Sequence, residues 1–463
     1  ALPTGIVLTA AAGVAVLGKM SLLHTLAVVL LPFIGWTGVW RFASVLGTRA
    51  ARIAAVAAYA AVPLPYASIA SGRWGALLLY ALMPWMVHLT RMLVGFADLS
   101  PLRETETLLM VAPSTWRRWF AGLSVLLAIS CAFEPATILV LPVVALLLFV
   151  ATFSHGLHVK WSSRWIVVTV AAVLTAIVMN LPWSATYIRT GWWEALTGAP
   201  VESGRNLGLW SLLRFSVGGF TLSSVSVFLY VAVAGSLVLV RGARTGWALR
   251  GAALVTGGLL IAILDDSALL PAHLPEPAVL LVPVAFGIAI CAGTLGASLN
   301  VDLRKGKFSW RQPLGALVAV ALAIGLVPTA LNAVGGDWHQ PSLTLPQLLA
   351  QLPQGATEGD YRTMYIGDSR VLPGAPLNFG WGISYSVMNG ALPTTDEQWE
   401  VPPTRVRDDA VSAMYGIVRG KTSRAGRLLA PLSVRFIVVP IIDGGQSTRE
   451  NPIEVPRGLV DAL

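Results

Sequence analysis

Glu134 is the acidic residue whose setting first suggests chemistry. It lies in "CAFEPATILV" (131–140), inside a stretch that is otherwise apolar from Trp119 to Phe153. A carboxylate in such a place can serve a membrane enzyme as a general base. The pair Glu134-Pro135 also suits a tight turn between two helices, because proline takes a first helical position and a carboxylate is favoured at a positive helix end. The turn interpretation is the simpler one, and it predicts that Glu134→Gln causes no functional loss.

Three further acidic residues are weaker catalytic candidates. Asp265 and Asp266 open the segment "DDSALLPAHLPEP", which also contains His273. Adjacent aspartates can hold a divalent cation, but at a membrane boundary they more often cap a helix or face water. Glu194 lies in a long polar segment at 189–215, close to a pair of tryptophans. The catalytic candidates in the sequence are therefore Glu134, Glu194, Asp265 and Asp266. The aspartate pair also suggests a divalent cation as a cofactor.

Arginines and tryptophans suggest a second kind of chemistry, the binding of a sugar and a phosphate. The segment "RTGWWEALTGAPVESGRNLGLWSLLRF" (189–215) combines both residue types, and "SGRWG" places Arg73 in a short turn. Tryptophans at such positions form an interfacial belt, and arginines reach lipid headgroups. Together they can also make a platform for a sugar linked to a lipid phosphate. The candidate binding residues are Arg73, Arg189, Trp192, Trp193 and Arg205.

The elements that must position these residues are membrane helices. Hydrophobic residues make up 55% of the chain, charged residues 12%, and the mean hydropathy is +0.70. Apolar runs of about 18 to 25 residues match the thickness of a bilayer, in which the backbone must be helical. We predict eleven transmembrane helices, near 5–18, 21–40, 53–71, 74–96, 119–133, 135–154, 165–188, 221–240, 249–264, 277–299 and 314–333.

The loops between these helices predict the orientation of the chain. Alternate loops hold sixteen lysines and arginines, whereas the other set holds five. That second set also holds six acidic residues: Glu134, Glu194, Glu202, Asp265, Asp266 and Glu276. Since cytoplasmic loops retain cations, the first set is predicted to be cytoplasmic, as is the N-terminus. The net charge of +9 therefore reflects membrane topology and does not indicate a nucleic-acid partner.

The last part of the chain differs from the rest. From 334 to 463 no apolar run is long enough to cross a bilayer, so residues 1–333 are predicted to form a polytopic domain and 334–463 a soluble extracytoplasmic domain. Segments 361–368 and 434–442 have strand patterns and 404–418 a helical one, which predicts a small α/β fold. "GDS" at 367–369 presents Asp368 either to a ligand or in an ordinary turn. The chain begins without Met and ends soon after a strand, which favours a segment of a larger protein.

Three stretches carry a resemblance to a known family: "YASIASGRWGALLLYALMPWMVHLTRML" (66–93), "RTMYIGDSRVLPG … GISYSVMNGALPTTDEQW" and "GKTSRAGRLLAPLSVRFIVVP". They resemble the membrane and extracytoplasmic parts of large actinobacterial cell-envelope glycosyltransferase-like proteins, of the mycobacterial type. Their polytopic region is similar to the GT-C class. In that class the catalytic carboxylate lies on the first extracytoplasmic loop. Here that loop is "GKMS", which has no acidic residue.

The resemblance implies transfer of a sugar from a polyprenyl-phosphate donor to an envelope glycan acceptor, at the outer face of the plasma membrane. Such a transfer needs a carboxylate to deprotonate the acceptor hydroxyl and cations to hold the lipid phosphate. The alternative is a non-catalytic module for envelope assembly or transport that binds lipid or glycan. An ion-coupled transporter is disfavoured, because no predicted span carries an acid at its middle.

Overall fold

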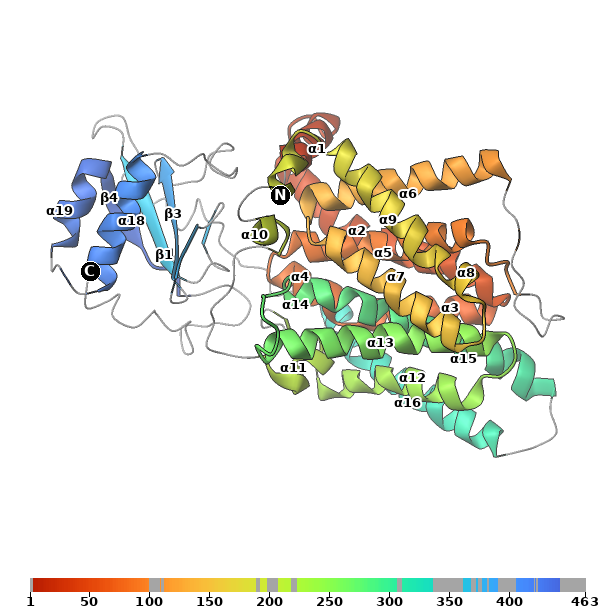
Figure 1. The fold of residues 1–463 in the computed structure, drawn as a ribbon. Coiled ribbons are helices and arrows are strands. Elements are labelled where there is room, and N and C mark those ends of the chain that lie inside the picture. Colours follow the sequence, from red (N-terminus) through yellow and green to blue (C-terminus); the bar gives the residue numbers. More distant parts are fainter. Residues whose placement is uncertain are drawn as a thin grey trace. The chain divides into compact units, whose positions relative to one another are not determined.

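The computed structural model describes residues 3–99, 109, 112–188, 192–197, 207–217, 223–305, 310–335, 361–367, 372–373, 377–380, 383–389, 405–419, 421 and 424–441. The chain divides into two compact units. The first comprises Ala1–Gly198 and Leu207–Trp338, and the second comprises His339–Leu463 with Ala199–Asn206. The first unit is a bundle of helices and the second contains a small sheet (Figure 1).

Long helices build the first unit. In its first half they are α1 (Pro3–Ala15), α2 (Met20–Phe42), α3 (Arg49–Ala61), α4 (Leu64–Ala70), α5 (Trp74–Val94), α6 (Pro113–Phe133), α7 (Thr137–Ser154), α8 (Val159–Ser162) and α9 (Arg164–Met179). In its second half they are α10 (Trp192–Thr197), α11 (Gly208–Leu213), α12 (Val231–Leu239), α13 (Arg244–Asp266), α14 (Pro277–Leu280), α15 (Val282–Lys305) and α16 (Arg311–Gly335). Short 3-10 helices cover Ala43–Leu46 (η1), Trp183–Ile188 (η2) and Ser224–Tyr230 (η3).

Eight helical segments of the described chain are long and apolar enough to cross a membrane, so the chain is a multi-pass membrane protein. Two further apolar helices, Thr4–Ala15 and Ser224–Leu239, are shorter. Helix α6 has a suitable length of 21 residues but is not among the eight, and it carries Arg117 and Arg118 near its start. The helix predicted near 165–188 is shorter than expected, because α9 ends at Met179 and η2 follows.

Helix α15 is the centre of the bundle. The apolar stretch of this helix is buried along its whole length, and the helix packs against both α3 and α13. Small residues allow these close approaches. A β-carbon added at Gly287 of α15 would lie 2.6 Å from the carbonyl oxygen of Gly251 in α13, and one at Gly293 would lie 3.1 Å from Ala55 Cβ in α3. Backbones that approach this closely are typical of helix packing in membranes.

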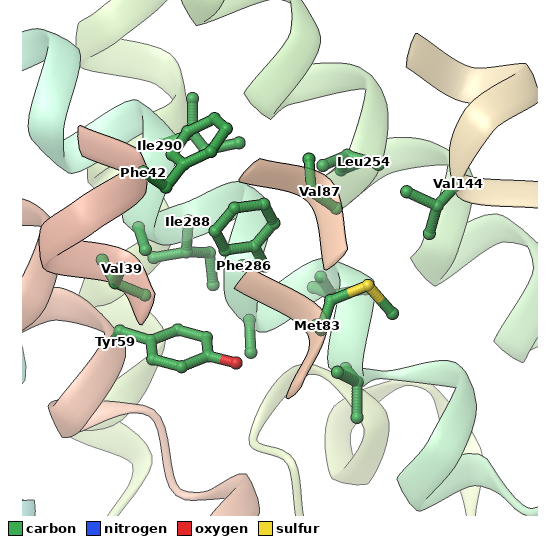
Figure 2. Close-up of a cluster of buried hydrophobic side chains, with 14 of the residues drawn as sticks. Val39, Phe42, Tyr59, Met83, Val87, Val144, Leu254, Phe286, Ile288 and Ile290 are labelled. Carbon is green, nitrogen blue, oxygen red and sulfur yellow. The ribbon is translucent and has the colours of Figure 1, made fainter. Parts of the chain in front are cut away.

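Large side chains fill the space around α15. Phe286 and Ile288 of this helix lie beside Phe42 of α2 and Tyr59 of α3, while Met83 and Val87 come from α5 (Figure 2). Tyr59 and Tyr80 stack at 4.1 Å, and each hydroxyl donates a hydrogen bond to the other residue's backbone carbonyl. The hydroxyls are therefore satisfied inside an apolar core.

One end of the bundle, here called the arginine end, is defined by Arg41, Arg91, Arg164, Arg250 and Arg311. Arg250 is fully buried, its guanidinium lies over the rings of both Phe96 and Trp247, and its Nε donates to Thr152 Oγ1 over 2.9 Å. Arg91 donates to the Phe96 carbonyl and pairs with Asp98 at 2.8 Å. Two buried guanidinium groups thus fix the segment after α5.

The opposite end, here called the carboxylate end, is defined by Arg73, Glu134, Asp265, Asp266 and Glu276. Arg73 lies between α4 and α5, Glu134 follows α6, the two aspartates end α13 and Glu276 precedes α14. Figure 1 shows α4, α10, α11 and α14 together at this end. In the part of the first unit that the structure describes, the cation-rich loops thus lie at the arginine end and the other set of loops lies at the carboxylate end.

The second unit contains a four-stranded sheet with the order β2-β3-β1-β4. Its strands are β1 (Arg362–Gly367), β2 (Leu377–Gly380), β3 (Ile383–Asn389) and β4 (Val434–Val438). Strand β1 pairs antiparallel with β3 and parallel with β4. Helices α18 (Arg405–Val418) and α19 (Ala425–Leu429) and the 3-10 helix η5 (Ala430–Leu432) precede β4 along the chain.

Apolar side chains from the sheet and from α18 form the core of this unit. Met364 and Ile366 of β1 pack with Met414 and Ile417 of α18. The predicted strands at 361–368 and 434–442 and the predicted helix at 404–418 are confirmed, within a few residues, by β1, β4 and α18. Strands β2 and β3 were not predicted. Asp368 lies outside the described residues.

Candidate functional site

Glu134 forms the turn between α6 and α7, as its sequence predicts. Its backbone N–H donates to the carbonyl of Ser130 over 2.7 Å, and its carbonyl accepts from the N–H of Thr137 over 3.0 Å. The hydroxyls of Ser130 and Thr137 lie 2.9 Å apart and tie the two helices together. The backbone of Glu134 is thus fully used by the turn.

The side chain of Glu134 has a separate position, against the start of α5. A β-carbon added at Gly75 would collide with the Glu134 carboxylate, so the absence of a side chain at 75 makes room for it. The residue keeps part of its surface exposed, yet protein atoms surround its carboxyl group. This burial raises the pKa of Glu134 to about 7, although the backbone N–H of Ala136 favours the ionised form. A carboxyl group that titrates near neutral pH can accept a proton from a substrate.

Tyr187 lies close to this carboxyl group and was not recognised in the sequence. The pKa of its hydroxyl is raised by burial, and then by the nearby Cys131 and Glu134, which places it in the neighbourhood of both. Its oxygen is buried and has no hydrogen-bond partner within the described residues. Pro182, which follows α9 in "NLPW", is the signal that could have indicated a break before Tyr187.

Arg73 precedes α5 by one residue and forms an ion pair with Glu276, which lies in the loop before α14. Its Nε also donates to Ser71 Oγ over 3.1 Å. The Arg73 side chain is 13% exposed and that of Glu276 is 35% exposed, so the arginine is the more buried member of the ion pair. Only Trp74 separates Arg73 from Gly75, against which Glu134 packs.

The two adjacent aspartates at the end of α13 bind different loops. Asp265 Oδ1 accepts the N–H of Leu274 over 2.8 Å. Asp266 accepts the N–H groups of Leu207 and Gly208, each over 2.8 Å, with its two carboxylate oxygens. Because each carboxylate is directed to the backbone of its own loop, the pair does not form a shared set of ligands for a divalent cation. The aspartates act as anchors for two loops of the carboxylate end.

The two tryptophans of the predicted platform have different environments. Trp193 donates its Nε1–H to the carbonyl of His273 over 2.7 Å, and Thr197 Oγ1 lies 2.9 Å from His273 Nε2. Trp192 packs edge-on against Trp193 and is 47% exposed. Trp193 is therefore a structural contact of the loop at 267–276, whereas Trp192 has a face open to a ligand.

The structure brings several predicted residues to one place. The loop at 267–276 contacts Trp193 through His273 and Arg73 through Glu276, so the segment after η2 and the turn before α5 meet at the carboxylate end. Arg189, Arg205 and Glu202 lie outside the described residues, as does the side chain of Glu194. Their predicted roles stay predictions.

A cavity of about 60 Å³ lies beside this end of the bundle. Its walls come from α7, α13, α14 and the start of α15, and Leu274 and Pro275 of the same loop also line it. The lining is apolar: Leu139, Val140, Val143, Leu147, Gly258, Ile261, Leu274, Pro275, Leu280 and Pro283. Such a cavity suits a hydrocarbon chain and does not suit water.

Among the described side chains, no group of three or more His, Cys, Asp or Glu residues could hold a metal ion. Comparisons of the chain with models of protein families, with curated proteins and with solved structures found no significant match.

Proposed function

We propose that this chain is a membrane glycosyltransferase, or the membrane half of one, that transfers a sugar from a polyprenyl-phosphate donor to a cell-envelope glycan. The observation that carries the proposal is the position of Glu134: its carboxyl group lies against Gly75, two residues from Arg73, with a pKa of about 7. A base and a cation are the two groups that such a transfer needs at one place.

In the proposed reaction Glu134 accepts the proton of an acceptor hydroxyl. The oxygen of that hydroxyl then bonds to the anomeric carbon of the donor sugar, and the bond from this carbon to the phosphate oxygen breaks. Arg73 would stabilise the negative charge of the departing polyprenyl phosphate. The apolar cavity beside Leu274 and Pro275 would receive part of the prenyl chain.

The proposed topology follows the charges of the loops. Eleven spans of a GT-C-like fold would start with a cytoplasmic N-terminus and place the carboxylate end and the second unit outside. Reactive labelling of cysteines introduced in 334–463 tests this: the proposal requires labelling from outside the intact cell, and labelling only after the inner face is opened would overturn it.

Binding of a polyprenyl-phosphate sugar to the purified chain tests the function. Arg73→Ala, Arg189→Ala and Arg205→Ala are compared with the parent, and a lost charge-assisted contact should weaken binding about tenfold or more. Glu276→Gln is the control for Arg73, because it removes the ion-pair partner and keeps the cation. It should bind at least as well as the parent. Parental affinity in all three arginine variants would exclude this site, and no binding by the parent would favour the non-catalytic module.

A further inference from the structure

The arginine end carries a patch of cations beside the lipid-facing surface of α2 and α3. The patch consists of Trp40 and Arg41 at the end of α2 and of Arg49, Arg52 and Ile53 at the start of α3. The first acidic residue of the sequence is Asp98, and it pairs with the buried Arg91. Within the described residues, no ion pair engages Arg41, Arg49 or Arg52.

The patch spans two helices that a cation–π contact joins. The guanidinium of Arg52 in α3 lies over the indole of Trp40 in α2, 5.7 Å from the ring centre. Arg49 is one helical turn before Arg52, so the two share a face of α3. The Nε of Arg52 is buried and has no hydrogen-bond partner in the described parts of the chain.

The surface next to these cations is apolar. Ile53 is 54% exposed and follows Arg52 directly, and Phe33 of α2 is 51% exposed. Both helices belong to candidate membrane spans, so this surface contacts the hydrocarbon chains of the bilayer. Trp40, with its ring partly exposed, is suited to the boundary between headgroups and chains. The patch thus passes from cations to an indole and then to apolar side chains, in the same order as the parts of a phospholipid.

We infer that the patch formed by Trp40, Arg41, Arg49, Arg52 and Ile53 is a binding site for an anionic phospholipid. The phosphate lies at Arg49 and Arg52 with Arg41 beside it, and an acyl chain lies along Ile53. Basic residues between membrane helices recognise anionic headgroups through these contacts. The inference is independent of the proposed function, since it concerns the opposite end of the bundle from Glu134.

The sequence supplies a matched control for this site. Arg117 and Arg118 at the start of α6 are also exposed cations, and they belong to the loops predicted to share a membrane face with α3's start. Replacing either pair removes the same charge from the protein. A diffuse attraction to anionic lipid would respond equally to both replacements, whereas a defined site at α2 and α3 responds to one.

The test is titration of the purified full chain in detergent with dioleoylphosphatidylglycerol, with bound lipid counted by native mass spectrometry. We expect tighter binding than of dioleoylphosphatidylcholine, and a loss on the order of tenfold or more in the double variant Arg49→Gln, Arg52→Gln. Arg117→Gln, Arg118→Gln should bind like the parent. High salt should weaken binding, because it screens exposed charges.

Equal binding of the two lipids by the parent would overturn the inference, and so would an equal loss in the two double variants. Thermal unfolding of each variant checks that it is folded. Should the first double variant fail to fold, Arg41→Gln and Trp40→Leu carry the same test, because each removes one part of the site without a substitution in α3. Parental affinity in both would also overturn it.

Discussion

The carboxylate of Glu134 occupies the space that a side chain at position 75 would need. This contact joins the turn between α6 and α7 to the first turn of α5. It explains how a turn residue can have a buried carboxyl group. The turn interpretation and the catalytic interpretation of Glu134 are therefore compatible, because the first uses its backbone and the second its side chain.

Glu134→Gln tests the catalytic interpretation. We expect sugar transfer to fall by about 10²–10⁴-fold, the usual contribution of a general base, while the chain stays folded. Transfer by the parent should rise as the pH increases through about 7, where the carboxyl group loses its proton. The readout is transfer from a polyprenyl-phosphate sugar by purified protein, together with envelope glycan in a complementation assay. Parental glycan in cells that carry Glu134→Gln would leave only the turn role.

Gly75→Ala should displace the Glu134 carboxylate without changing any ionisable residue. A methyl group at 75 cannot coexist with the carboxylate in its present position, so either the side chain rotates away or α5 shifts. We expect lower transfer activity and a Glu134 pKa closer to its ordinary value.

Gly122→Ala is the control for this substitution. Its added methyl group meets only Leu89, at 3.6 Å, so in the middle of α6 it should be neutral or stabilise by up to about 1 kcal/mol. Equal activity of the two alanine variants would contradict the tight contact between Gly75 and Glu134.

The stability of the chain should depend on pH through Glu134. Its pKa is raised from 4.5 to about 7 in the folded state, so between these values the folded chain binds more protons than the unfolded chain. The contribution of this group is fully present below about pH 4.5 and is lost as the pH rises through about 7. A pKa that differs by one between the folded and the unfolded chain corresponds to about 1.4 kcal/mol in the free energy of unfolding.

Thermal unfolding in detergent at pH 5.5 and pH 8 measures this effect. We expect a lower midpoint at pH 8 in the parent and a smaller difference between the two pH values in Glu134→Gln, which has no titratable group at 134. The same difference in both proteins would show that another group is responsible.

The helices were predictable because membrane spans are set by length and composition. The apolar runs near 21–40, 74–96 and 277–299 correspond to α2, α5 and α15, since a bilayer leaves the backbone no alternative to a helix. Strand β3 was missed although its segment "ISYSVMN" alternates Ile, Tyr and Val with serine, which is the period-two pattern of a half-buried strand.

The site was less predictable than the fold. Glu134 and Arg73 were recognised by residue type, but their relation depends on how α5 packs against the turn before α7, which no local pattern records. The ion pair of Arg73 with Glu276 joins two loops far apart in the sequence. The two aspartates at 265 and 266 were considered together because they are neighbours in sequence. Their hydrogen bonds show that neighbours on a helix end can serve different loops.

Gly287→Ala should separate the two helices at the centre of the bundle. The added methyl group would lie 2.6 Å from the carbonyl oxygen of Gly251, a backbone atom that cannot move aside by rotating. We expect a loss of about 1–3 kcal/mol in stability, as for other overpacked sites. The measurement is thermal unfolding in detergent with Gly122→Ala as the reference, and an unchanged midpoint for Gly287→Ala would contradict the close packing of α13 and α15.

Arg250→Lys tests whether the buried arginine is held by its flat guanidinium group as well as by its charge. The guanidinium lies 4.4 Å from the ring centre of Phe96 and 4.6 Å from that of Trp247, and its Nε donates to Thr152. Lysine keeps the charge but has no flat guanidinium group to lie over the two rings, and its compact ammonium group is more costly to bury. Desolvated cation–π contacts contribute up to about 2 kcal/mol each, so we expect a clear fall in the unfolding midpoint.

Arg419→Lys is the matched control, because Arg419 lies over the single ring of Tyr415 at an exposed position of the second unit and should lose little stability. Equal, small changes in the two lysine variants would mean that charge alone holds Arg250, and that the segment after α5 is fixed by Arg91 and Asp98 instead.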